Sequence, residues 1–397
     1  MPKPARAPAT TTALVMSGGG ARGAYQAGVL AGLADLGLIS NNTPLPFRIL
    51  VGSSAGAINA AGMAAMAAQP TDGVARLVNA WSKVEAKQVF RTDLRSLGGI
   101  GVSWARDLSL GGLTGKVSPK ALLDTSPLRG TIDDWIPFNK ISRNIESGAV
   151  DALVLAATNL YTSTGIVFVE GAADHPLWQQ RRRRIERTKI GVDHVMASSA
   201  IPLLFPPVHL EDRWFGDGSI RNTTPLSPAI HLGAEKILAI SVREQRPNMG
   251  HPTGGDPQSA PSIAEIAGVL LDAVMLDAIE VDVEHSYRVN DSIMRCAQPL
   301  PGQPFHWVDV LALHPSEDIS SLAAELVARV PRVVRYLLRG LGSEAAITEL
   351  TSYLLFDPVF CGRLIDLGRR DVMTNQDELR DFFTGPPRVP QLPTAPE

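Results

Sequence analysis

Short apolar runs alternate with helical patterns along the first 243 residues. Five runs have the length of buried strands: 13–16, 47–51, 151–157, 165–169 and 236–242. Residues 165–169 are predicted to form a hairpin with 151–157. Apolar residues recur at helical spacing in three stretches between them: 23–36, 55–68 and 225–232. Strands that alternate with helices predict an α/β fold, a three-layer α/β/α sandwich with a mostly parallel central sheet.

The pattern changes after residue 243. A stretch rich in proline and glycine, 244–261, predicts a loop. Residues 262–384 are predicted to be mainly helical, with one strand near 306–313, and we expect this region to pack on the domain before it. Helical spacing runs over 320–341, with a kink at Pro331, and over 343–356. The Pro-rich ends, 1–12 and 385–397, predict disordered tails.

Composition excludes some classes of function. The 397 residues are 45% apolar and 19% charged, which is ordinary for a globular protein, and a net charge of -3 argues against nucleic acid as a partner. Two cysteines give no disulfide framework, and the histidines show no metal-binding spacing, so we expect neither metal nor cofactor. Without a secretory signal or a long uncharged apolar run, a cytoplasmic location without a spanning helix is expected.

A candidate nucleophile stands between the second strand and its helix. Gly52-Ser53-Ser54-Ala55-Gly56 reads G-x-S-x-G, and this context is the one that a nucleophile elbow requires. Gly52 and Gly56 would let strand and helix approach closely, and the helix N-terminus would favour negative charge developing near Ser54. The alternative interpretation is a glycine-rich structural turn.

A glycine loop follows the first strand. Residues 18–23, Gly-Gly-Gly-Ala-Arg-Gly, match the G-x-G-x-x-G fingerprint of dinucleotide sites, but the second strand ends without the acid that would bind a ribose. We therefore favour an oxyanion hole formed by the backbone N–H groups of Gly18, Gly19 and Gly20, here called the oxyanion loop. Arg22 either helps to hold this loop or is exposed.

The candidate general base is Asp217, which follows a short apolar run and precedes Gly218. A carboxylate beside a serine hydroxyl can accept its proton directly, provided that burial or hydrogen bonding tunes the carboxyl pKa. The alternative is an ordinary Asp-Gly turn.

A rival candidate for the base is His314, which follows a predicted strand where the histidine of an α/β-hydrolase triad would lie. Against this triad, Ser54 follows only the second strand.

The glycine loop, G-x-S-x-G and Asp-Gly, in that order, resemble the patatin-like phospholipase family, as do the flanking runs at 196–208 and 217–229. The resemblance covers 13–243, which it marks as a catalytic domain. It implies a Ser–Asp dyad: Ser54 as nucleophile, Asp217 as general base and Gly18–Gly20 as the oxyanion hole. Supporting motif positions would be Arg22, Gly23, Gly52, Gly56 and Gly218. Ser219 departs from the family pattern, which usually has Gly or Ala there.

What the resemblance implies is a carboxylic ester hydrolase that cleaves fatty acyl esters through an acyl-serine, without a metal. Acyl transfer by the same dyad and a non-catalytic lipid-binding scaffold are the alternatives.

Two further segments have two interpretations each. Arg181–Arg184 either contact anionic phospholipid headgroups, as a peripheral membrane site, or form a solvated surface segment. Residues 98–114 form either a lid over an acyl pocket or an ordinary loop.

Overall fold

A computed structural model describes most of the chain. The described residues are 10–91, 121–172, 178, 183–244, 277–295, 306–331, 334–335 and 344–387. The predictions for 98–114, for most of both tails and for nearly all of the loop at 244–261 lie outside these residues, as do Arg181 and Arg182.

Nine strands form one sheet in the described part of the chain. Its main order is β5-β4-β3-β2-β1-β8-β9, and β7 pairs with β3 and with β6. The bounds are β1 Thr12–Met16, β2 Ile49–Gly52, β3 Ala152–Asn159, β4 Thr164–Gly171, β5 Arg183–Arg187, β6 Val208–Leu210, β7 Arg213–Asp217, β8 Lys236–Ile240 and β9 Asp309–Leu313. β3, β2, β1, β8 and β9 are parallel neighbours, whereas β4 returns antiparallel beside β3 as a hairpin.

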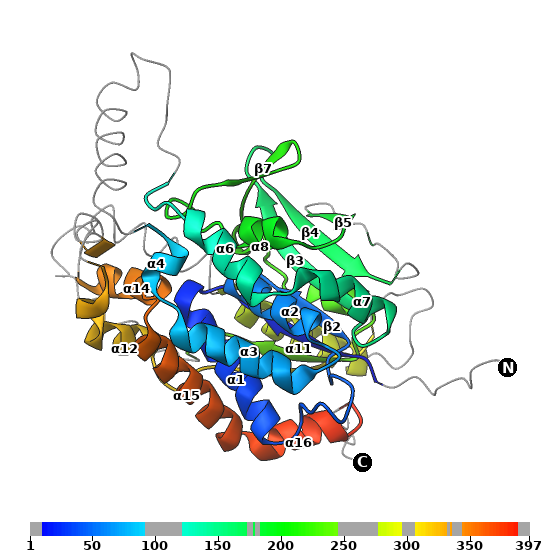
Figure 1. Ribbon diagram of the computed structural model, residues 1–397. Helices are drawn as coiled ribbons and strands as arrows, with labels where there is room; N and C mark the ends of the chain where they lie inside the picture. The colour runs from blue at the N-terminus through cyan, green and yellow to red at the C-terminus, as the bar shows by residue number, and fades with distance from the viewer. Residues whose placement is uncertain are drawn as a thin grey trace.

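Helices cover both faces of the sheet (Figure 1). On one face lie α1 Gly23–Asp35, α2 Ala55–Ala65, α3 Pro70–Lys83 and α15 Pro358–Thr374. On the other lie α9 Ser227–His231 and α11 Asp277–Arg295. Alternate residues of β1 point to opposite faces, Leu14 and Met16 to the first and Ala13 and Val15 to the second. The predicted α/β/α architecture, with its mostly parallel sheet, is confirmed.

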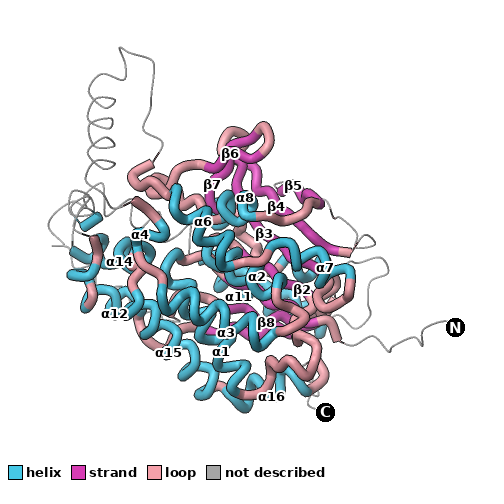
Figure 2. The backbone as a smooth tube through the Cα atoms, in the orientation of Figure 1, coloured by secondary structure: helices cyan, strands magenta, loops and turns pink. Residues whose placement is uncertain are grey.

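The remaining described helices are shorter or lie at the periphery. Their bounds are α4 Ala86–Val89, α6 Ser126–Trp135, α7 Ile141–Glu146, α8 Val192–Ser198, α12 Ile319–Glu325, α14 Glu344–Leu354 and α16 Gln376–Thr384, with 3-10 turns η1 Gly20–Arg22, η2 Phe138–Lys140, η3 Gly218–Ile220 and η4 Val327–Arg329. Figure 2 shows α12 and α14 side by side, at the same end of the molecule.

One helix prediction is wrong in its extent. The spacing over 320–341 predicts a helix that continues past Pro331 with a kink there, but α12 ends at Glu325 and the 3-10 turn η4 follows. Val330, the residue before the proline, has extended backbone angles of φ −60° and ψ 134°. The proline ring disfavours helical angles at the preceding residue, so the chain leaves the helical path before Pro331.

Helix α1 is almost completely enclosed. Eleven of its thirteen residues are buried, and α15 packs along its outer side (Figure 1). The two backbones approach so closely that a Cβ atom at Gly28 would lie 2.3 Å from the carbonyl oxygen of Ile365. The Tyr25 hydroxyl also donates a hydrogen bond of 3.0 Å to Asp371. The C-terminal helices are therefore part of the same core as the sheet.

Candidate active site

Ser54 occupies a strained turn between β2 and α2. Its φ of 54° and ψ of −124° are unusual for a residue with a side chain, and it is the N-cap residue of α2. The two motif glycines make the turn possible. A Cβ atom at Gly52 would lie 2.2 Å from the Gly56 oxygen, and one at Gly56 would lie 2.3 Å from the Met16 oxygen. The geometry is that of a nucleophile elbow.

Two serines that the sequence argument assigned no role hold the elbow. The backbone N–H of Ser54 donates to Ser198 Oγ at 3.1 Å, and Ser199 Oγ donates to the Ser54 carbonyl at 3.2 Å. Ser198 ends α8, which is 144 residues from Ser54 in sequence. Nothing local to Ser54 indicated this contact, although the two serines lie in the run at 196–208 that carried the family resemblance.

Asp217 lies at the end of β7, completely buried. Its Oδ1 accepts a hydrogen bond of 2.9 Å from the Ser219 N–H, and its Oδ2 has no hydrogen-bond partner among the described residues. Burial raises the pKa of Asp217 to about 6, while the Ser219 backbone and the Ser54 and Ser219 hydroxyls act in the opposite direction. The Ser54 hydroxyl is thus one of the groups that favour the ionised form of the carboxyl.

The oxyanion loop leaves β1 at the sheet edge where β2 enters the elbow, since Met16 pairs with Gly52. Gly19 and Gly20 have φ values of 153° and 57°, which only glycine adopts readily. Within the described residues, the backbone N–H groups of Gly18–Gly20 donate no hydrogen bond. The structure therefore brings together a serine, a buried carboxyl and a glycine loop with available N–H donors.

The family model described as patatin-like phospholipase matches residues 14–230, which is more than half of the chain and spans all three motifs. The chain belongs to the patatin-like phospholipase family. A search of curated proteins finds no match. Among solved structures, VipD from Legionella pneumophila is similar, with a TM-score of 0.36 and 13% identity over 94% of this chain and 67% of VipD.

In this patatin-like protein, Arg22 is held rather than exposed. The residue is 2% exposed, and Nε donates to Ser352 Oγ at 2.8 Å. Nη2 donates to Ser320 Oγ at 3.0 Å and forms an ion pair with Glu349. The sequence had left both alternatives open, because the partners lie about 300 residues away and give no local signal.

The other motif glycines serve close packing. A Cβ atom at Gly23 would lie 2.7 Å from Ala55 Cβ, and one at Gly218 would lie 2.2 Å from the Ala156 oxygen. Gly23 thus lets α1 approach the elbow helix, and Gly218 lets the residue after Asp217 approach β3. Ser219, the departure from the family pattern, is buried and donates its backbone N–H to Asp217.

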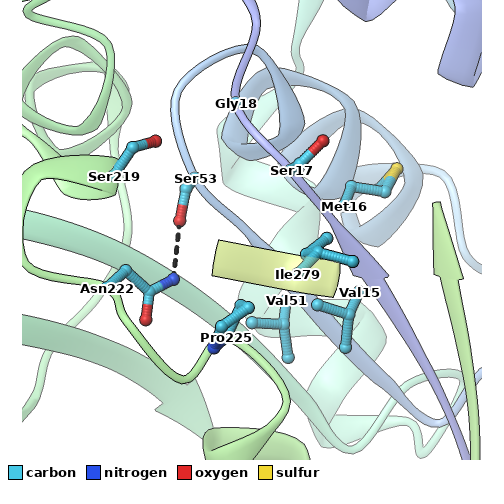
Figure 3. Close-up of a pocket in the computed structure, with 10 residues that line it drawn as sticks. All are labelled: Val15, Met16, Ser17, Gly18, Val51, Ser53, Ser219, Asn222, Pro225 and Ile279. Carbon is cyan, nitrogen blue, oxygen red and sulfur yellow. Dashed lines mark hydrogen bonds between the residues drawn. The ribbon is translucent and has the colours of Figure 1, made fainter. Parts of the chain in front are cut away.

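A small cavity of about 20 Å³ adjoins the elbow, room for roughly one water molecule (Figure 3). Its lining includes Gly18, Ser53 and Ser219, one residue from each motif, above apolar side chains such as Val51 and Ile279. In Figure 3 the Ser53 hydroxyl points toward Asn222, whose Nδ2 donates to it at 2.9 Å. Ser54 and Asp217 are not among the residues that line this cavity.

The rival histidine is far from Ser54. His314 follows β9, and two strands, β8 and β1, separate β9 from β2. Three strand spacings amount to roughly 14 Å. The His314 ring instead faces Glu280, with 3.8 Å between Nδ1 and Oε1. The structure does not assemble a Ser54–His314 pair.

The arginine run is only partly described, and one of its members is buried. Arg183 lies in β5, is 8% exposed and donates through Nη1 to the Thr224 carbonyl at 2.9 Å. It is therefore not available to a lipid headgroup, which corrects that part of the prediction. Arg184 is exposed beside Glu186.

In the described ranges, no helix has the length and apolar character to cross a membrane, and no cluster of acidic, histidine or cysteine side chains is arranged to hold a metal.

Proposed function

We propose that this chain is a serine lipid acyl hydrolase that cleaves fatty acyl esters through an acyl-Ser54 intermediate, with Asp217 as general base. Membership of the patatin-like phospholipase family supports lipid acyl hydrolysis in general. The observation that most directly supports the proposed mechanism is the burial of Asp217. Its pKa is raised to about 6, and its Oδ2 has no hydrogen-bond partner in the part of the chain that the structure describes. The hydroxyl of Ser54, which stands on a strained elbow, is among the groups that act on this pKa. A base with a pKa near the working pH transfers protons efficiently.

The reaction would proceed in two halves. In the first, Ser54 Oγ attacks the ester carbonyl carbon while Asp217 accepts the hydroxyl proton. The N–H groups of Gly18–Gly20 and the N-terminus of α2 stabilise the negative oxygen of the tetrahedral intermediate. The alcohol then leaves with the proton from Asp217. In the second half, water attacks the acyl-serine and Asp217 takes a proton from that water. The bond between the acyl group and Ser54 Oγ then breaks, the fatty acid leaves, and Asp217 returns the proton to Ser54 Oγ.

The test compares ester hydrolysis by wild type, Ser54→Ala and Asp217→Asn. With p-nitrophenyl butyrate and longer esters, each variant should lose about 10²- to 10⁴-fold in kcat while circular dichroism shows a folded protein. Asp212→Asn, an exposed position on the same hairpin as Asp217, is the matched control and should keep wild-type rates. A fluorophosphonate should label Ser54, as located by mass spectrometry.

Two outcomes would contradict the proposal. Full activity of Ser54→Ala would show that the elbow is only a turn. Labelling of another serine would place the nucleophile elsewhere. Product analysis with an added alcohol acceptor then separates hydrolysis, which releases free fatty acid, from acyl transfer, which yields a new ester.

A further inference from the structure

Two C-terminal helices converge on the side chain of Arg22. Ser320 lies in α12, and Glu349 and Ser352 lie in α14. Arg22 Nη2 donates to Ser320 at 3.0 Å and to Ser352 at 2.5 Å, and it pairs with the Glu349 carboxylate. The Ser320 hydroxyl in turn donates to the other oxygen of Glu349. The guanidinium is therefore bound on several sides by one polar cluster.

The same helix also touches the oxyanion loop directly. A Cβ atom at Gly20 would lie 2.4 Å from the carbonyl oxygen of Tyr353, so the loop backbone rests on α14. The Tyr353 ring lies under the guanidinium of Arg22, with 4.5 Å from Cζ to the ring centroid. On the other side, Val242 contacts Gly19, where a Cβ atom would lie 2.6 Å from Cγ2.

A restraint on Arg22 acts on the loop because one short turn joins them. Gly20–Arg22 form the 3-10 turn η1, and the Arg22 N–H donates to the Gly19 carbonyl at 3.1 Å. Three successive glycines have a large conformational freedom to lose on folding, so without an anchor their N–H groups would not keep one direction. Donors of this kind must be held to within about 0.5 Å to stabilise a transition state.

Charge explains why an acid is needed in the cluster. Arg22 is 2% exposed, and a buried guanidinium requires a paired anion. Burial alone would raise the pKa of Glu349, but the Arg22 charge and hydrogen bonds from Ser320 and Arg22 lower the pKa below its usual value. Glu349 therefore stays ionised at neutral pH.

We propose that Glu349 is a positioning residue of this enzyme: through Arg22 it fixes the N–H groups of Gly18–Gly20, so α14 belongs to the catalytic unit. The inference rests on the proposed function, because it requires that the oxyanion loop bind the developing oxyanion. It assigns Glu349 no contact with substrate.

Glu349→Gln in the full chain tests the proposal. The kcat for p-nitrophenyl ester hydrolysis should fall about tenfold to hundredfold, as expected for a small misplacement of catalytic groups, with KM within about twofold. The matched control is Glu325→Gln in α12, whose carboxylate forms an exposed ion pair with Arg363. This control should keep wild-type kcat, since the ion pair is exposed to solvent and does not include Arg22.

A transition-state analogue separates positioning from general destabilisation. A trifluoromethyl ketone adds to the active serine and places a negative oxygen in the oxyanion hole. Its affinity should fall in parallel with kcat/KM in Glu349→Gln, because both depend on the same donors. If the variant only lost folded protein, a smaller fraction of Ser54 would react with a fluorophosphonate. The affinity of the protein that remained folded for the ketone would be unchanged.

Further outcomes decide between the two proposals. If Ser54→Ala is inactive while Glu349→Gln keeps wild-type kcat and ketone affinity, the positioning role is overturned and the dyad stands. If Ser54→Ala is as active as wild type, the proposed function itself has failed. Should Glu349→Gln not fold, Glu349→Asp retains the charge on a shorter side chain. A reduced kcat at unchanged KM would then support the proposal, and wild-type kcat and ketone affinity would overturn it.

Discussion

At the scale of single residues, the proposed mechanism depends most on Asp217, whose raised pKa follows from its burial. An exposed aspartate is too weak a base for a serine hydroxyl, since its pKa lies near 3.9. Here the carboxyl is completely buried, one oxygen is bound by the Ser219 N–H, and burial raises the pKa to about 6. In the proposed mechanism, burial thus brings the pKa of a carboxyl close to that of a histidine side chain.

The pH dependence of activity follows from this pKa. Only ionised Asp217 accepts a proton, so kcat/KM should rise with pH through about 6 and level off above it. One pH unit below the pKa, about a tenth of the maximum should remain. Initial rates with p-nitrophenyl butyrate across this range measure the curve. A profile that is flat through this range, in a protein that stays folded, would argue against Asp217 as the base.

The free energy of unfolding should depend on the same group, but ionisation of Asp217, which favours activity, should lower stability. Because the folded pKa is raised above the unfolded value, protonated Asp217 favours the folded state at low pH, and this contribution is lost as pH rises through about 6. Asp217→Asn removes the buried charge. It should raise the free energy of unfolding by up to about 3 kcal/mol at pH 8 and change it little at pH 4. Urea denaturation at both pH values measures the difference, and an equal loss of stability at both would contradict this account.

At the scale of elements, the elbow is a crossing of three backbones made possible by missing side chains. β1, β2 and the first turn of α2 meet where Gly56 faces the Met16 carbonyl. The motif was legible in the sequence because this requirement is local: strand, glycine, serine, glycine and helix follow one another directly. The strands of the parallel sheet were equally legible, since burial on both faces makes each one a continuous apolar run.

Gly56→Ala should disrupt this crossing. Its Cβ atom would lie 2.3 Å from a backbone oxygen, so strand and helix must separate, at a cost of about 1–3 kcal/mol in unfolding free energy. Gly130→Ala in α6 is the matched control, because a Cβ atom there meets nothing within 4 Å and alanine favours a helix. Chemical denaturation of both variants should give changes of opposite sign. A neutral Gly56→Ala would show that the close approach is not needed.

Other elements could not be predicted from the sequence, for physical reasons. β5 begins with two arginines and ends with a third, and β6 has three residues, so neither forms an apolar run. The helix predicted over 320–341 failed because its apolar spacing continues across Pro331, whereas the backbone does not. The partners of Arg22 and of the Ser54 backbone are long-range contacts between polar side chains, which leave no periodic trace in either segment.

At the scale of the whole molecule, segments distant in sequence share one core. α15 covers α1, and α14 supports the loop that follows β1. The Tyr25 hydroxyl reaches Asp371, which also accepts a hydrogen bond of 2.5 Å from Ser316. The resemblance at the level of motifs covers 13–243, but the geometry of the candidate site depends on residues beyond it.

The position of β1 in the sheet has a consequence for synthesis. β1 is paired on one side by β2 and on the other by β8, which begins at Lys236. At translation rates of about 5–20 residues per second, roughly 10–45 seconds separate the two strands on the ribosome. Throughout that interval, one edge of this mostly apolar strand lacks its partner β8, and such an edge invites pairing with other chains. We therefore expect chaperones that shield exposed strand edges to bind the nascent chain until β8 has been made.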